Sequence, residues 1–84
     1  MNRDHIIAIV TRTVERCGGA PITGMTMTLA ALKLGAPGRK ALAEGVEMHT
    51  GLEMDASDFS DATTLTDVVL LISARIHAAI PLAA

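Results

Sequence analysis

Phe59 is the only aromatic residue in a chain of 84 residues, half of which are hydrophobic. The core must therefore consist of aliphatic and methionine side chains, which suit packed helices and are poor material for a small β-barrel. A chain of this length holds one modest core and has no room for a deep, enclosed active site. We therefore expect one all-α domain over residues 1–84, and we do not expect an enzyme.

Apolar residues recur at three- and four-residue intervals in three segments, which is the period of an amphipathic helix. A fourth, short segment follows Asp55, which suits a helix cap, and Phe59 is expected to point inward from it. These patterns predict a bundle with helices over residues 3–16, 37–50, 56–61 and 64–78. A long loop over residues 20–36 joins the first two, and its expected core anchors are Leu29, Leu32 and Leu34.

Glycine and proline mark the expected helix ends. Gly18 and Gly19 follow the first predicted helix, where glycine accepts the left-handed conformation without penalty. Pro37 is expected to be the first residue of the second helix, with Ala36 as its N-cap. Gly51 is expected to end that helix.

Two further features concern helix starts and helix packing. Thr64, with Asp67 three residues later, is a variant of the capping box and starts the last predicted helix. Gly45 lies inside the second predicted helix, where glycine costs about 1 kcal/mol relative to alanine. We therefore expect a neighbouring element to approach the second helix closely at Gly45.

Charge is unevenly distributed along the chain. Residues 1–42 carry six basic and two acidic residues, for a net charge of +4, whereas residues 43–84 carry one basic and seven acidic residues, for −6. The two halves either attract one another or present differently charged faces to a partner, and the alternative is that these are solvated faces of a bundle. The net charge of −2 and the lack of stacking aromatics argue against a nucleic-acid partner.

Cysteine and histidine usage excludes several kinds of site. Cys17 is the only cysteine, so an intramolecular disulfide and a multi-thiolate zinc site are both excluded. The histidines lack the paired spacing of metal ligands, so we expect no metal; they are His5, His49 and His77. The apolar run over residues 68–72 is far too short to span a bilayer, and charged residues interrupt any signal segment near the N-terminus. We expect a cytoplasmic protein.

Three segments, in one ungapped register, resemble the acyl carrier protein family. TLAALKLGAP (residues 28–37) is similar to the family's hydrophobic segment that leads into Asp-Ser-Leu at the start of its second helix. TGLEM (residues 50–54) resembles the Phe-Gly-Ile-Glu-Ile sequence that follows this helix. TTLTDVV (residues 63–69) resembles the Thr-Thr-Val-x-Asp entry to the last helix. The resemblance covers roughly residues 3–76 and implies the carrier bundle, with a long first loop and a short third helix.

The resemblance also implies what the chain lacks. In the family, the serine of Asp-Ser-Leu is esterified by phosphopantetheine, and acyl chains ride on the thiol of that arm. Here Gly35, Ala36 and Pro37 occupy the three positions, so the hydroxyl is absent. We therefore expect no phosphopantetheine and no conventional acyl carriage. The expected function is a non-catalytic module for protein–protein interaction, with an enzyme of fatty acid or polyketide-type biosynthesis as partner.

The second helix of ordinary carriers is acidic and meets basic patches on enzymes, whereas this one begins with two cations. Candidate contacts for a partner or an anion are Gly38, Arg39, Lys40, Glu44 and Glu47. Free N–H groups at a helix start next to two cations suit a phosphate or another anion. The spacing does not match a Walker A loop, and a solvated basic helix end is the alternative interpretation.

Other interpretations remain open at this point. The chain could be an atypical carrier that uses Ser60 or Cys17 as its attachment site, or that holds a ligand noncovalently. Four methionines could line an adaptable apolar cavity, or they could fill the core; they are Met25, Met27, Met48 and Met54. The chain could also be a small structural bundle whose likeness to carriers is accidental, in which case residues 20–36 need not wrap across the bundle.

Overall fold

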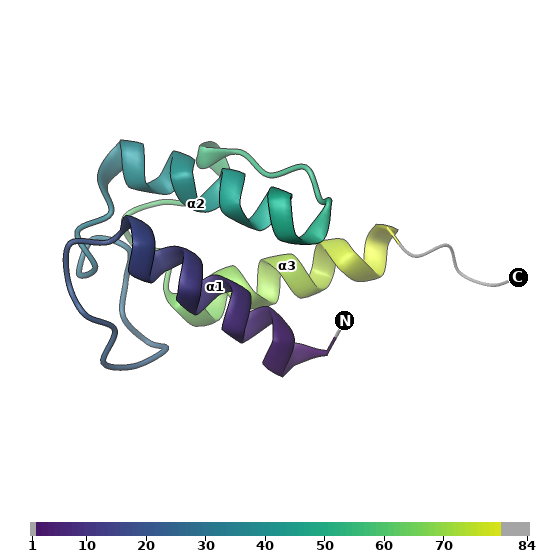
Figure 1. Ribbon diagram of the computed structural model, residues 1–84, viewed down its shortest axis with the longest axis horizontal. Helices are drawn as coiled ribbons and strands as arrows, with labels where there is room; N and C mark the ends of the chain where they lie inside the picture. The colour runs from purple at the N-terminus through teal and green to yellow at the C-terminus, as the bar shows by residue number, and fades with distance from the viewer. Residues whose placement is uncertain (1, 80–84) are drawn as a thin grey trace, which may run out of the picture.

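Three α-helices make up the computed structural model, which describes residues 2–79. They are α1 (Arg3–Cys17), α2 (Gly35–Thr50) and α3 (Leu65–Ala79), and a 3₁₀ turn, η1 (Ala56–Asp58), precedes α3. The chain runs along α1 in the direction opposite to α2 and α3 (Figure 1). α1 contacts both other helices, and η1 contacts α2. The expected all-α class is confirmed, and residues 2–79 contain no β-strand longer than an isolated bridge.

The short helix predicted over residues 56–61 forms only the three-residue turn η1. The N–H of Asp55 donates to the side chain of Asp58 over 2.9 Å, which closes this turn on itself. Phe59 then leaves the helical conformation, with φ of −118° and ψ of 146°, and its side chain is buried. The inward position of Phe59 is therefore as predicted. It also ends the helix, because the backbone becomes extended at this residue.

The start of α2 differs from the prediction that Ala36 caps the helix and Pro37 opens it. The helix begins at Gly35, and Leu34 occupies the N-cap position without a side-chain cap. Gly35 has φ of +56°, in the left-handed region that side chains with a Cβ disfavour. Pro37 lies within the first turn, where its missing N–H costs nothing because first-turn N–H groups have no intrahelical acceptor.

Gly18 follows α1, but the predicted left-handed conformation at this residue was wrong. Its φ is −85°, and its N–H donates to the carbonyl of Val14 over 2.7 Å. A Cβ at this position would lie 3.0 Å from the Val14 carbonyl oxygen and 3.3 Å from that of Leu32. Close approach of the backbone therefore explains glycine here. Gly51 at the end of α2 does adopt the predicted left-handed conformation, with φ of +73°.

The core lies where the three helices and the first loop meet. The predicted close approach at Gly45 is confirmed, because a Cβ there would lie only 2.5 Å from Cγ2 of Thr13 on α1. Ile9 and Ala43 are buried although the apolar pattern did not single them out. The largest side chains that are fully buried are those of Leu29, Leu32, Leu42, Leu65, Ile72, Val10, Val14, Val46 and Val68.

The loop between α1 and α2 is attached to the start of α3. Its anchors are buried as predicted, and backbone bonds join it to residues about 40 positions later in the chain. Leu29 N–H donates to Thr63 O over 2.9 Å, and Leu65 N–H donates to Met27 O over 3.1 Å. These bonds carry the loop across one end of the bundle, where it connects α1 to α2 (Figure 1).

α3 begins with the capping box that its sequence predicts. Thr64 N–H donates to the Asp67 carboxylate, and Asp67 N–H donates to the Thr64 hydroxyl, each over 3.1 Å. Within residues 2–79, no helix combines the length and the hydrophobicity that a membrane span requires.

Candidate functional site

Ala36 and Pro37 are exposed in the first turn of α2, at the position where the carrier resemblance places its attachment site. Ala36 presents a methyl group, which has no nucleophilic atom. The neighbouring residues are not free to vary. Leu34 is buried, and a Cβ added at Gly38 would lie 2.9 Å from Cδ2 of Leu34. This helix start is therefore closely packed around a chemically inert exposed residue.

Few hydrogen-bond donors remain at this helix start for the anion that the sequence predicted. Pro37 lacks an N–H, and the N–H of Gly38 donates to the carbonyl of Leu34 over 2.9 Å. The guanidinium of Arg39 is paired with the carboxylate of Asp61. The N–H groups of Gly35 and Ala36 remain for an anion, together with the exposed side chain of Lys40. Arg39 is therefore bound to Asp61, and the structure does not bring all the predicted anion contacts together.

The Arg39–Asp61 ion pair shows that the basic and acidic halves of the chain attract one another at one place. It joins the basic half of the chain to the acidic half and holds the segment after η1 against α2. Glu44 and Glu47 are exposed on α2 and belong to neither of the two ion pairs found among residues 2–79.

Ser60, the alternative attachment hydroxyl, directly precedes Asp61, whose carboxylate pairs with Arg39 of α2. Its Oγ is exposed and lies 3.2 Å from Oγ1 of Thr63. The N–H of Ser60 donates to the same Thr63 oxygen over 2.9 Å. The hydroxyl is accessible, and it has a hydrogen-bond partner but no neighbouring base in these contacts.

Cys17, the other alternative attachment site, is half-buried at the end of α1. Burial raises the pKa of its thiol, and the neighbouring positive charge of Arg16 lowers it only in part. Because the thiolate is the nucleophile, a raised pKa makes this thiol a weak one at neutral pH. The environment of Cys17 therefore disfavours direct acylation.

The four methionines do not share one cavity. Met25, Met27 and Met54 pack against the core, whereas Met48 on α2 is 82% exposed. Met25 lines one cleft and Met48 lines another, and neither of these clefts is lined by a second methionine. This arrangement matches core filling for three of the methionines and leaves Met48 as a surface residue.

Arg75 of α3 binds the acidic segment around η1, a contact that the sequence pattern did not predict. Its guanidinium donates to both carboxylate oxygens of Asp58, over 2.8 and 2.7 Å, and to the carbonyl of Glu53 over 3.0 Å. The hydrogen bond from Arg75, followed by the N–H of Asp55, holds the pKa of the Asp58 carboxyl below its usual range. One signal was available in the sequence, because Arg75 is the only basic residue after Lys40.

Side chains that could hold a metal do not gather. Among residues 2–79, no group of three or more His, Cys, Asp or Glu side chains is placed to bind an ion. The three histidines lie on three different helices, and Nδ1 of His49 lies 2.8 Å from the carbonyl oxygen of Gly45.

Comparison of the chain with models of protein families, with curated proteins and with solved structures finds no match. The resemblance to acyl carrier proteins therefore rests on the three sequence segments and stays a prediction.

Proposed function

We propose that this chain is a non-catalytic interaction module with a carrier-like bundle, which docks to a protein partner and carries no phosphopantetheine arm. The observation that carries the proposal is the exposed methyl group of Ala36 in the first turn of α2. A transferase needs a hydroxyl at this place, and none is present. The partner suggested by the resemblance is an enzyme of fatty acid or polyketide-type biosynthesis.

The residues around Ala36 also support the proposal, because they differ from the carrier sequence in ways that go beyond the missing hydroxyl. Gly35 has a left-handed φ of +56°, which suits glycine and disfavours the aspartate that precedes the serine in carriers. Gly38 is buried against Leu34 at the same helix start. The long first loop, which crosses the bundle end to reach α3, supports the carrier-like arrangement over an accidental likeness.

The test is incubation with a promiscuous phosphopantetheinyl transferase and coenzyme A, followed by intact-mass analysis. A genuine acyl carrier protein in the same reaction is the positive control. We expect the control to gain the arm and this chain to keep its mass. A mass gain on this chain would overturn the proposal, and peptide mapping would then identify the modified residue.

A second candidate function is an atypical carrier that uses Ser60. The observation that favours it is the exposed hydroxyl of Ser60, which directly precedes the Asp61 that pairs with Arg39 of α2. This candidate predicts a covalent adduct on protein purified from its own host, and loss of that adduct in the Ser60→Ala variant. If native mass spectrometry of protein purified from its own host shows neither an adduct nor a co-purifying lipid, this second candidate function is excluded.

A further inference from the structure

A groove with a volume of about 340 Å³ runs along the seam between α1 and α2. A second cleft of about 200 Å³ continues it, because Thr13, Arg16 and His49 line both. The first part is lined by His5, Ala8, Ile9, Arg12, Thr13, Arg16 and His49. The second adds the exposed side chain of Met48, together with Cys17, Ala41, Glu44 and Gly45.

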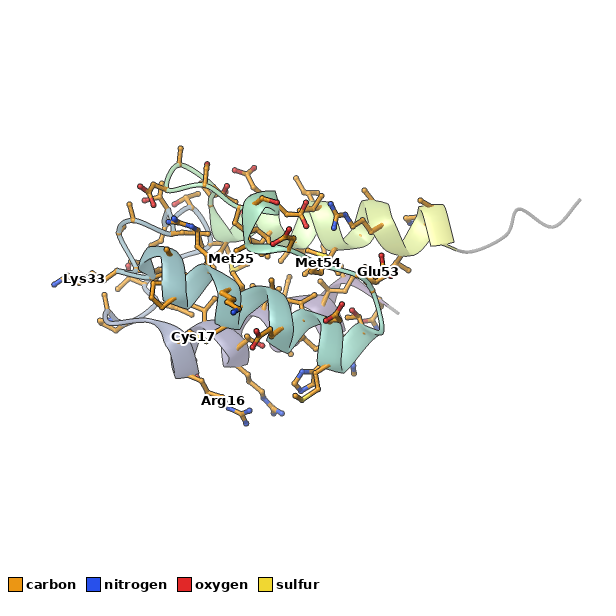
Figure 2. The ribbon with its side chains drawn as sticks, turned by 90° about the horizontal axis from the view of Figure 1, so that it is seen from above. Arg16, Cys17, Met25, Lys33, Glu53 and Met54 are labelled. Atoms are coloured by element: carbon orange, nitrogen blue, oxygen red, sulfur yellow. The ribbon has the colours of Figure 1, made fainter. Side chains whose placement is uncertain are left out.

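The two clefts together form the α1–α2 groove. No carboxylate lines its larger part, whereas Glu44 lines the smaller part together with Met48. Neither Arg12 nor Arg16 belongs to the ion pairs formed within residues 2–79. Figure 2 shows Arg16 extending away from the end of α1. A carbonyl can only accept, so Nδ1 of His49 donates to Gly45, and Nε2 is left for another partner. The groove therefore offers two guanidinium groups, those of Arg12 and Arg16, that form no ion pair with the described residues.

The two guanidinium groups follow the axis of α1 instead of converging on one point. Arg12 and Arg16 are four residues apart, which separates them by about 6 Å along the helix axis at 1.5 Å per residue. The groove offers no free N–H groups of a helix start, because the N–H of His5 in the first turn of α1 donates to the side chain of Asn2, and Arg12 and Arg16 lie in later turns. This arrangement suits a row of negative charges better than a single phosphate, which binds best where several donors meet.

The floor and rim of the groove fit a helix laid along it. Ala8 and Ala41 contribute only small side chains to the groove, and Met48 provides an adaptable apolar contact at its edge. A helix lying alongside α1 repeats its own side chains at the same intervals. Carboxylates on one of its faces can thus meet the cations in register, in the manner of a helix bound in a groove.

We propose that the α1–α2 groove docks an acidic amphipathic helix of a partner protein, with carboxylates against Arg12 and Arg16 and an apolar residue against Met48. The inference rests on the proposed function in that it assigns a docking face to the interaction module. The two are tested separately, because intact mass reports the arm and a peptide titration reports the groove. The attraction for an acidic helix is local to the groove, because the chain as a whole has a net charge of −2.

The test uses two synthetic helical peptides of equal composition. One carries glutamates at positions i, i+4 and i+7 of one face beside a leucine, and the other has the same residues scrambled around the helix. Each is titrated into ¹⁵N-labelled protein at 0.15 M salt, with fluorescence anisotropy for affinity. We expect the patterned peptide to shift the backbone resonances of Arg12, Arg16 and Met48. We also expect it to bind at least tenfold more tightly than the scrambled one.

Two double variants with the same change in net charge separate the groove from general attraction. Arg12→Glu with Arg16→Glu should weaken the patterned peptide at least tenfold. Arg3→Glu with Lys33→Glu, at exposed positions outside the groove, should weaken it by less than about threefold, because charges beyond a Debye length of about 8 Å are largely screened. Lys33 extends from the end of the bundle, away from Arg16 (Figure 2). Circular dichroism checks that both variants fold, and Gln replaces Glu if the groove variant does not.

Several results would overturn the proposal. Equal weakening by both double variants would show attraction to overall charge alone, and equal binding of the scrambled peptide would show that no helix face is required. Inorganic phosphate that shifts the same resonances at a comparable concentration would identify a small-anion site instead. Shifts that depend on protein concentration without peptide, together with a dimer in sedimentation, would identify a second copy of this chain as the occupant.

Discussion

The guanidinium of Arg75 binds both carboxylate oxygens of Asp58 and so fastens the turn η1 to α3, 17 residues later in the chain. The same side chain donates to the carbonyl of Glu53, so one residue binds both η1 and the segment between α2 and η1. A fork of parallel hydrogen bonds is stronger and more directional than a single ion contact. Arg75 thereby positions the residues that lead to the buried Phe59.

Replacement of Arg75 by alanine should lower the free energy of unfolding by about 1 kcal/mol, as expected for a partly exposed but bidentate pair. Urea unfolding followed by circular dichroism measures the change. Arg3→Ala, at an exposed position, is the matched control and should change stability by less than about 0.5 kcal/mol. Equal effects of the two substitutions would show that the Arg75 pair contributes nothing specific.

The lowered pKa of Asp58 makes stability depend on pH in a defined direction. A carboxyl whose pKa is lower in the folded state binds protons more readily when unfolded. The stabilisation is therefore present above the unfolded pKa, near 3.8, and is lost as the pH falls through the lower folded value. Thermal unfolding of wild type between pH 5 and pH 2 should show a steeper loss than Asp58→Asn. Parallel pH profiles would contradict this account.

Gly45→Ala should destabilise the protein by about 1–3 kcal/mol, the usual cost of overpacking, although alanine favours a helix. The new Cβ would lie 2.5 Å from Cγ2 of Thr13, so α1 and α2 would have to move apart. Thr13→Ser removes that methyl group and keeps the hydroxyl that donates to Ile9. The double variant should therefore recover much of the loss.

The control for Gly45 is Gly24→Ala, because a Cβ at Gly24 would meet nothing within 4 Å. Chemical unfolding of all four variants measures the coupling between Thr13 and Gly45. A Gly45→Ala variant that is as stable as wild type would show that the contact between α1 and α2 adjusts freely.

Introducing two of the three residues of the carrier sequence Asp-Ser-Leu, one at a time, should have different consequences for stability. Gly35→Asp should cost about 1 kcal/mol, because the left-handed φ of this residue disfavours a side chain. Ala36→Ser should change stability by less than about 0.5 kcal/mol, since the residue is exposed and is not the N-cap of α2. Thermal unfolding of the two single variants distinguishes them. A marked gain from Ala36→Ser would indicate a capping role that the structure does not show.

Much of the fold could be predicted because its causes are local. The apolar spacing of α1 and α3, the Thr64–Asp67 capping box and the left-handed end of α2 at Gly51 each involve residues within a turn or two of one another. The missing hydroxyl at Ala36 is likewise a property of the sequence alone. The single aromatic residue, Phe59, was also expected to be buried, and it is.

The remaining features depend on residues that are distant in sequence. α2 begins at Gly35 and not at Pro37, because Leu34 is buried in the core while the loop before it bonds to the start of α3. Gly18 is explained by the carbonyl of Leu32, which only the folded loop brings near. Local patterns carry no information about such contacts.

The sequence by itself determined an all-α chain with three long helices, and an alanine at the position where the resemblance to carriers leads one to expect a serine. Only the tertiary structure decided which charges are paired and which are left over. Arg39 and Arg75 are held by carboxylates from distant segments, whereas Arg12 and Arg16 line the seam between α1 and α2. The reason is physical: helical periodicity follows from neighbours three and four residues away, but an ion pair or a groove exists only where packing brings two elements together.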